Sequence, residues 1–173
     1  MCGNRHAEIT DLPESGVEGV LAGPAESGIF AARSMRIDIL SAVPAVGQVH
    51  DYERWSNDWN KFLALFQDPA TKQILGWEIT RVAAPTDKLD NIEELVAHNY
   101  VIQGYMGLND ALATEKTFQA LIEAVKAAFR NQHTLGGLCM DAGPLSLEIC
   151  EARNFGSVLC HYTKLTLPVS EIQ

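Results

Sequence analysis

The spacing of apolar residues changes its period near residue 52. Val46–Tyr52 is rich in β-branched and aromatic residues and predicts a short strand, whereas a helical spacing begins at Glu53. The apolar stripe of this helix consists of Trp55, Trp59, Phe62 and Phe66, with Leu63 and Leu65 beside them. We expect the stripe to face the core, as most stripes with this spacing do. An exposed aromatic stripe that binds a partner is the alternative.

Alternation of apolar and polar residues predicts four further strands, over residues 74–84, 95–106, 145–150 and 158–169. In the first of them Trp77 and Ile79 alternate with Glu78 and Thr80, which is typical of a half-buried strand. A polar, acidic connection, Pro85–Glu94, leads to the second strand, and we expect these two strands to pair antiparallel.

Two further helices are predicted. Apolar residues from Gly28 to Val43 share a broad face, and Pro44 ends that helix. Arg33 and Arg36 lie within or beside this face. We favour the interpretation that the aliphatic part of each arginine side chain reaches the edge of this face and carries the charge into water. The alternative is that an acidic residue, in this or another subunit, pairs with the guanidinium groups. The other helix has the clearest apolar face of the chain and should cover the sheet: Phe118, Leu121, Ile122, Val125, Ala128 and Phe129.

The order of these elements predicts an α+β fold with an antiparallel or mixed sheet of about four to five strands. Two to three helices are expected to pack mainly on one face. Residues 1–26 are rich in Gly, Pro, Ser and Glu without a sustained period, and predict a flexible N-terminal arm. The remaining residues, 27–173, predict a single domain, since 173 residues suit one core.

Charge restricts the partners that this chain is expected to bind. Thirteen Lys and Arg against 22 Asp and Glu give a formal net charge of −9, which opposes tight association with DNA or with an anionic membrane. No apolar run has the length of a membrane helix. Four cysteines, Cys2, Cys139, Cys150 and Cys160, lack CxxC spacing, which favours reduced thiols in a cytosolic setting.

The sequence offers little for catalysis. The GxSxG, GxGxxG and GxxxxGK[ST] motifs are absent. Cys160 and His161 are neighbours in a predicted strand, so their side chains should point to opposite faces and form no catalytic pair. We therefore predict no enzyme activity and no cofactor.

A metal site is not predicted either. Zinc could draw on Cys139, Cys150 and Cys160 with one of His98, His133 and His161, but the spacing is irregular and buried thiols are the favoured interpretation. The acidic run Asp87, Asp90, Glu93 and Glu94 lacks the alternating oxygen ligands and glycine of a calcium loop, so a solvated loop is expected. A small hydrolase or metal enzyme with scattered ligands remains an alternative.

Five segments, taken together, resemble tail-terminator or tail-completion proteins of tailed bacteriophages, of the type found in Mu-like tail gene clusters. They are Val49–Trp55, Leu75–Ile79, His98–Tyr105, Leu108–Phe118 and Phe155–His161. The resemblance covers most of the chain and implies a virion structural protein that forms a ring, typically a homohexamer, at the head-proximal end of the tail. Assembly would take place in the cytoplasm of the bacterial host. A head-completion or connector protein, or a tail tube subunit, is the alternative within the virion.

The resemblance also implies the partners: the tail tube protein, the head-side connector at the neck, and DNA that passes through the lumen without specific binding. No membrane is involved. A ring needs contacts between two different edges of neighbouring subunits. The charges suggest one such contact, in which Arg33 and Arg36 of one subunit meet the acidic residues Asp87, Asp90, Glu93 and Glu94 of the next.

Overall fold

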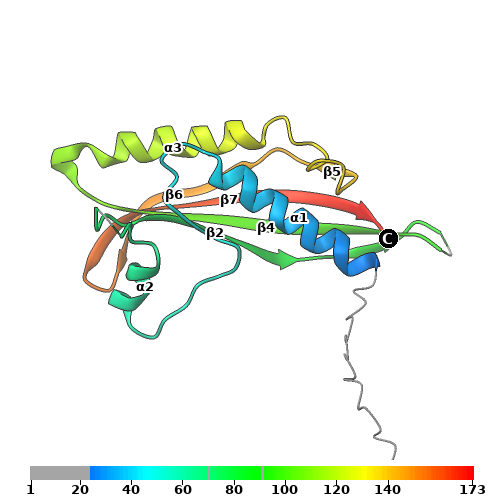
Figure 1. The fold of residues 1–173 in the computed structure, drawn as a ribbon, viewed down its shortest axis with the longest axis horizontal. Helices are drawn as coiled ribbons and strands as arrows, with labels where there is room; N and C mark the ends of the chain where they lie inside the picture. Colours follow the sequence, from blue (N-terminus) through cyan, green and yellow to red (C-terminus); the bar gives the residue numbers. More distant parts are fainter. Residues whose placement is uncertain (1–23, 70, 91) are drawn as a thin grey trace, which may run out of the picture.

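The computed structural model describes residues 24–69, 71–90 and 92–173 (Figure 1). Residues 1–23 of the predicted arm lie outside the described residues, and its last three, Pro24–Glu26, begin the first helix. The elements in chain order are α1 (Pro24–Ser41), β1 (Gln48–His50), α2 (Trp59–Leu65), β2 (Leu75–Ala83), β3 (Thr86–Lys88), β4 (Glu94–Gly107), the 3₁₀ turn η1 (Asp110–Leu112), α3 (Thr114–Phe129), β5 (Asp141–Ala142), β6 (Ser146–Phe155) and β7 (Val158–Ile172).

The seven strands form one mixed sheet that is built on the long pair β4 and β7. β7 runs antiparallel along β4 on one side, and β2 and β3 both pair with the other side of β4. β6 and β5 pair in the same way with the free side of β7, and β1 joins β2 as a parallel edge strand. The α+β class with a mixed sheet is therefore confirmed, with seven strands in place of the four to five predicted. The additional strands β3 and β5 have three and two residues, too few for alternation to reveal them.

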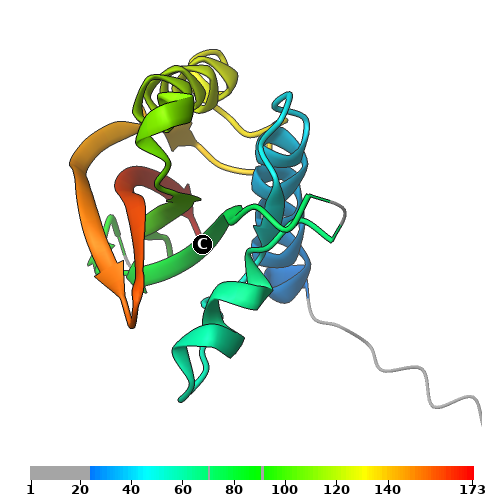
Figure 2. The same cartoon turned by 90° about the vertical axis from the view of Figure 1, so that its left-hand side faces the viewer.

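α1 and α3 cover one face of the sheet, over the larger part of the core (Figures 1 and 2). The five large apolar residues predicted for α3 are buried there, as are Leu40 and Val43 at the end of α1 and just beyond it.

Trp77 of β2 is fully buried and stacks on Phe118 at 6.0 Å between ring centroids. Its indole also lies against Gly104 of β4, where a Cβ atom would come within 2.6 Å of the ring. A glycine is therefore required for this close approach.

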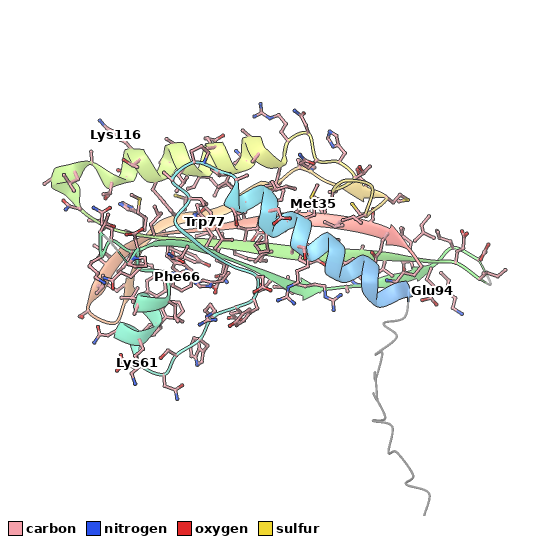
Figure 3. The ribbon with its side chains drawn as sticks, in the orientation of Figure 1. Met35, Lys61, Phe66, Trp77, Glu94 and Lys116 are labelled. Atoms are coloured by element: carbon pink, nitrogen blue, oxygen red, sulfur yellow. The ribbon has the colours of Figure 1, made fainter. Side chains whose placement is uncertain are left out.

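α2 packs on the opposite face, apart from the other two helices (Figure 1). Phe62 and Phe66 contact an aromatic cluster formed by Tyr105, Tyr162 and Phe155. Figure 3 shows Phe66 on this side of the sheet and Trp77 on the other. The middle of the sheet is thus covered on both faces, and β4 is buried almost continuously from Tyr100 to Met106.

The aromatic helix predicted from Glu53 is wrong in its first half. α2 begins only at Trp59, because Asp58 caps it by accepting hydrogen bonds from the backbone N–H groups of Asn60 and Lys61. Trp55 lies before the helix and is 70% exposed, and Trp59 is 45% exposed. The core prediction is confirmed for Phe62 and Phe66 and is wrong for the two tryptophans, which are exposed. Partner binding by these tryptophans stays a prediction.

The final hairpin is tighter than predicted. The strand expected over residues 145–150 extends to Phe155 as β6, and the turn to β7 lies at Gly156–Ser157. A register shift between Leu147 and Ile149 interrupts the alternation in β6, and Leu147 is exposed. The antiparallel pairing of β2 with β4 is confirmed, with Trp77 opposite Gly104.

Candidate functional site

A cleft of about 470 Å³ lies between α1, the segment after β1, and the end of β2. It contains three cations, Arg33, Arg36 and Arg81, and two anions, Asp51 and Glu53. Its apolar wall includes Tyr100 of β4. The three positive charges exceed the two negative ones, although the chain as a whole carries a net charge of −9.

Arg36 is the most unusual residue of this cleft. Only 1% of its surface is exposed, and its guanidinium carbon lies 3.5 Å from the centroid of the Tyr100 ring, a cation–π contact. Its Nε and Nη1 atoms have no hydrogen-bond partner. Burial lowers the pKa of Arg36, although a guanidinium of this kind stays protonated at neutral pH. The prediction that this side chain carries its charge into water is wrong, because α1 lies flat on the sheet and Tyr100 receives the guanidinium.

Arg33 follows the alternative prediction, in which an acidic neighbour receives the cation. Its Nη2 atom lies 3.3 Å from the carboxylate of Asp51, and its Nε and Nη2 donate to the backbone carbonyl of the same residue. The pair is partly exposed, so its net contribution to stability is small. Its structural effect is to fix α1 to the segment after β1, within one subunit.

The acidic residues of the predicted interface lie elsewhere, at the connection between β3 and β4. We call Leu89, Asp90, Ile92 and Glu93 the β3–β4 tip; Asp87 and Glu94 lie in the strands beside it. The Asp90 carboxylate accepts hydrogen bonds from the N–H groups of Ile92 and Glu93, which hold its pKa below the usual range. Ile92 is 88% exposed. Among the described residues, no ion pair joins this tip to the arginine cleft, so the predicted contact is not made within one copy of the chain.

Three exposed aromatic residues lie along the segment that leads from the cleft into α2. We call Tyr52, Trp55 and Trp59 the aromatic surface. Trp55 and Trp59 meet edge to face at 6.4 Å between ring centroids, and the guanidinium of Arg54 lies 4.9 Å from the ring centroid of Tyr52. Residues of this kind contribute most of the binding energy in many protein interfaces. Helical spacing alone could not reveal this surface, because the same spacing fits a buried stripe.

Glu78 was predicted on the solvent side of β2, and this prediction is wrong. Only 2% of its surface is exposed, because the segment before α2 and the aromatic cluster cover that face. Its carboxylate accepts hydrogen bonds from the Arg54 N–H at 2.8 Å, from the Tyr105 hydroxyl at 3.0 Å and from Gln103 Nε2 at 3.2 Å. Burial raises the pKa of Glu78. The side chain therefore holds the segment that carries the aromatic surface.

The thiols and histidines considered for chemistry are dispersed. Cys160 packs in the aromatic cluster, and His161 faces α3, where it stacks on Phe118 and lies 3.0 Å from the Thr114 hydroxyl. The prediction that their side chains point to opposite faces is confirmed. Burial raises the pKa of the Cys160 thiol to about 11. Cys150 is exposed, so the prediction of a buried thiol is wrong there. Within residues 24–69, 71–90 and 92–173, no three potential metal ligands come together.

No helix in the described part of the chain is long and apolar enough to cross a membrane. No protein-family model matches the chain, and no curated protein matches its sequence. A function must therefore be inferred from the resemblance of its segments and from the surfaces of the subunit.

Proposed function

We propose that this chain is a virion structural protein similar to phage tail terminators, which forms a homo-oligomeric ring at the head-proximal end of the tail. In this role it would cap the finished tail tube, join it to the head-side connector and let DNA pass without specific binding. The proposal rests on the five segments that resemble this family. The observation that carries it in the structure is the presence of two unlike exposed surfaces.

These surfaces lie toward opposite ends of the long axis of the subunit. Figure 1 shows α2 at one end and the connection between β3 and β4 at the other, and Figure 3 labels Lys61 and Glu94 in the same two places. A contact in which two different surfaces meet is heterologous, and repetition of it closes into a ring when the rotation allows. The position of the two surfaces supports such a head-to-tail contact.

The composition of the surfaces supports their pairing. The aromatic surface lies beside the arginines of the cleft, since Tyr52 lines that cleft and also stacks with Arg54. The β3–β4 tip presents aliphatic side chains with carboxylates around them. Arg33, which the sequence suggested for this contact, is already paired with Asp51. Arg36 is buried, so a carboxylate would have to enter the cleft to reach it.

Mixing two variants tests the head-to-tail contact. Trp55→Ser removes the aromatic surface and Ile92→Ser removes the tip; both side chains are well exposed, so the fold should persist. We expect each variant alone to be monomeric in sedimentation velocity. An equimolar mixture should form dimers, because one intact surface of each kind remains. Leu112→Ser, at an exposed position in η1, is the matched control and should assemble as the wild type does.

A wild-type chain that stays monomeric at all concentrations and does not associate with tail tubes would count against the proposal. Dimers formed by one of the two variants alone would point to a contact between like surfaces. In a phage that carries this gene, deletion separates the alternatives within the virion. Loss of a terminator gives tails of uncontrolled length, whereas loss of a head-completion protein gives normal tails that are not attached to heads.

A further inference from the structure

The guanidinium of Arg36 has hydrogen-bonding capacity that the described residues do not use. Its face is occupied by the Tyr100 ring, and this cation–π contact does not use the hydrogens of Nε and Nη1 at the edge of the guanidinium. Nε and Nη1 are buried without a partner, and no carboxylate of the described residues forms an ion pair with this side chain. A buried charge without a partner lowers the stability of the fold and suggests that its partner arrives from outside.

A second arginine lies close to this position. Arg81 of β2 pairs directly across the sheet with Tyr100, and residues that lie opposite each other on neighbouring strands point to the same face. The Arg81 side chain is exposed, lines the same cleft and makes no ion pair with a described residue. The nearby Arg33 is already engaged by Asp51. The cleft thus offers two available guanidinium groups beside one aromatic ring.

We propose that this cleft binds a carboxylate group, with Arg36 and Arg81 as the donors. The planar fork of a guanidinium matches the two oxygens of a carboxylate. Asp51 and Glu53 line the same cleft, so the excess of a single positive charge suits a monoanion and disfavours a phosphate dianion. Tyr100 and Ile79 supply an apolar wall for the rest of the ligand.

The carboxylate could come from a free small molecule or from an acidic side chain of a second copy of this chain. In the second case the site belongs to the proposed ring contact, and the β3–β4 tip would supply the carboxylate. The site itself does not depend on the ring, because a free carboxylate tests it on the monomer.

Nuclear magnetic resonance of the Arg36 Nε–H group tests the site directly. We expect acetate to shift this resonance in a saturable way, whereas acetamide, its neutral analogue, should leave it unchanged. A synthetic peptide that corresponds to residues 85–96 tests the second copy as the source. Saturation by the peptide at a concentration at least tenfold lower than that of acetate would assign the site to the subunit contact. Saturation by acetate at a lower concentration than by the peptide would assign the site to a free carboxylate.

Variants test the two donors. Arg81→Gln should weaken acetate binding at least tenfold without loss of the fold, since the residue is exposed. Arg36→Met should abolish the acetate-dependent shifts of the neighbouring Arg33 and Tyr100 resonances. Arg153→Met is the matched control, because Arg153 also lies over a tyrosine ring, at 4.0 Å from Tyr162, but is paired with Glu151 outside the cleft. It should bind acetate as the wild type does.

Three results would overturn the proposal. One is no saturable shift with either acetate or the peptide. Another is tighter binding of inorganic phosphate than of acetate. The last is wild-type affinity in Arg81→Gln, a measurement that remains decisive if Arg36→Met fails to fold. Self-association is measured separately, so the two proposals can fail independently. A monomer that binds acetate would support the carboxylate site and count against the ring. A ring whose cleft binds no carboxylate would support the ring and count against the carboxylate site.

Discussion

Glu78 is the residue that fixes the segment after β1 to the sheet. Its carboxylate joins the backbone of Arg54 to the side chains of Tyr105 and Gln103 in a site that is almost closed to water. Hydrogen bonds to a buried carboxylate stabilise the fold, but burial penalises the charged form. The second effect prevails, since the pKa of Glu78 is raised above its ordinary value of 4.5.

The raised pKa predicts how the contribution of Glu78 to stability depends on pH. A group whose pKa is higher in the folded than in the unfolded chain contributes most below the unfolded value, and this contribution is lost as pH rises through the folded pKa. Glu78→Gln removes the titratable carboxyl group and keeps the size and shape of the side chain. We expect the difference in unfolding free energy, wild type minus variant, to be largest below about pH 4.5 and to fall as pH rises through the raised pKa of Glu78. Urea unfolding at several pH values measures it, and a constant difference would contradict the prediction.

Gly104 gives a second prediction, which depends on packing alone. A Cβ at this position would lie 2.6 Å from the Trp77 ring, whereas a Cβ at Gly107 in the same strand would make ordinary contacts at 3.7 Å. Gly104→Ala should therefore destabilise the fold by about 1–3 kcal/mol, the usual cost of overpacking a core. Gly107→Ala should change stability by less than about 0.5 kcal/mol. Equal effects in urea unfolding would show that the indole moves aside.

The start of α2 shows what apolar periodicity can and cannot predict. The period correctly places Phe62 and Phe66 on one buried face, but it extends equally well to Trp55 and Trp59. The local hydrogen bonds decide the boundary: the Arg54 N–H is bound to Glu78, and Asp58 supplies the cap. β3 and β5 escaped prediction for a related reason, since strands of two or three residues exist only through pairing with β4 and β7.

The cap predicts a modest and specific loss of stability. Asp58→Ala removes the acceptor for the N–H groups of Asn60 and Lys61 and should cost about 1 kcal/mol. Asp58→Ser keeps an acceptor and should recover most of this loss. Thermal unfolding followed by circular dichroism gives the comparison. If the serine and alanine variants were equally destabilised, the side chain of Asp58 would act by something other than capping.

For the subunit as a whole, the prediction of helices mainly on one face of the sheet is confirmed by α1 and α3, and α2 covers the middle of the opposite face. α3 and the central strands β2, β4 and β7 could be predicted, since their periods are long and unambiguous. The burial of Glu78 and Arg36 could not, because a polar residue on a strand or helix face normally indicates solvent. The arginine cleft combines α1 with β2 and β4, segments that are far apart in the sequence, and its residues carry no local motif.

The proposed contact between the arginine cleft and the β3–β4 tip predicts how self-association responds to salt and to charge reversal. Glu93→Lys reverses a carboxylate at the β3–β4 tip, and Glu115→Lys makes the same change in net charge at an exposed position in α3. If the tip meets the arginine cleft of a neighbour, Glu93→Lys should weaken association about tenfold and reduce its salt dependence, since the lost contact is electrostatic. Glu115→Lys should leave both unchanged. Sedimentation equilibrium at low and high salt measures the two quantities, and an equal response of the two variants would mean that only overall repulsion between acidic subunits is at work.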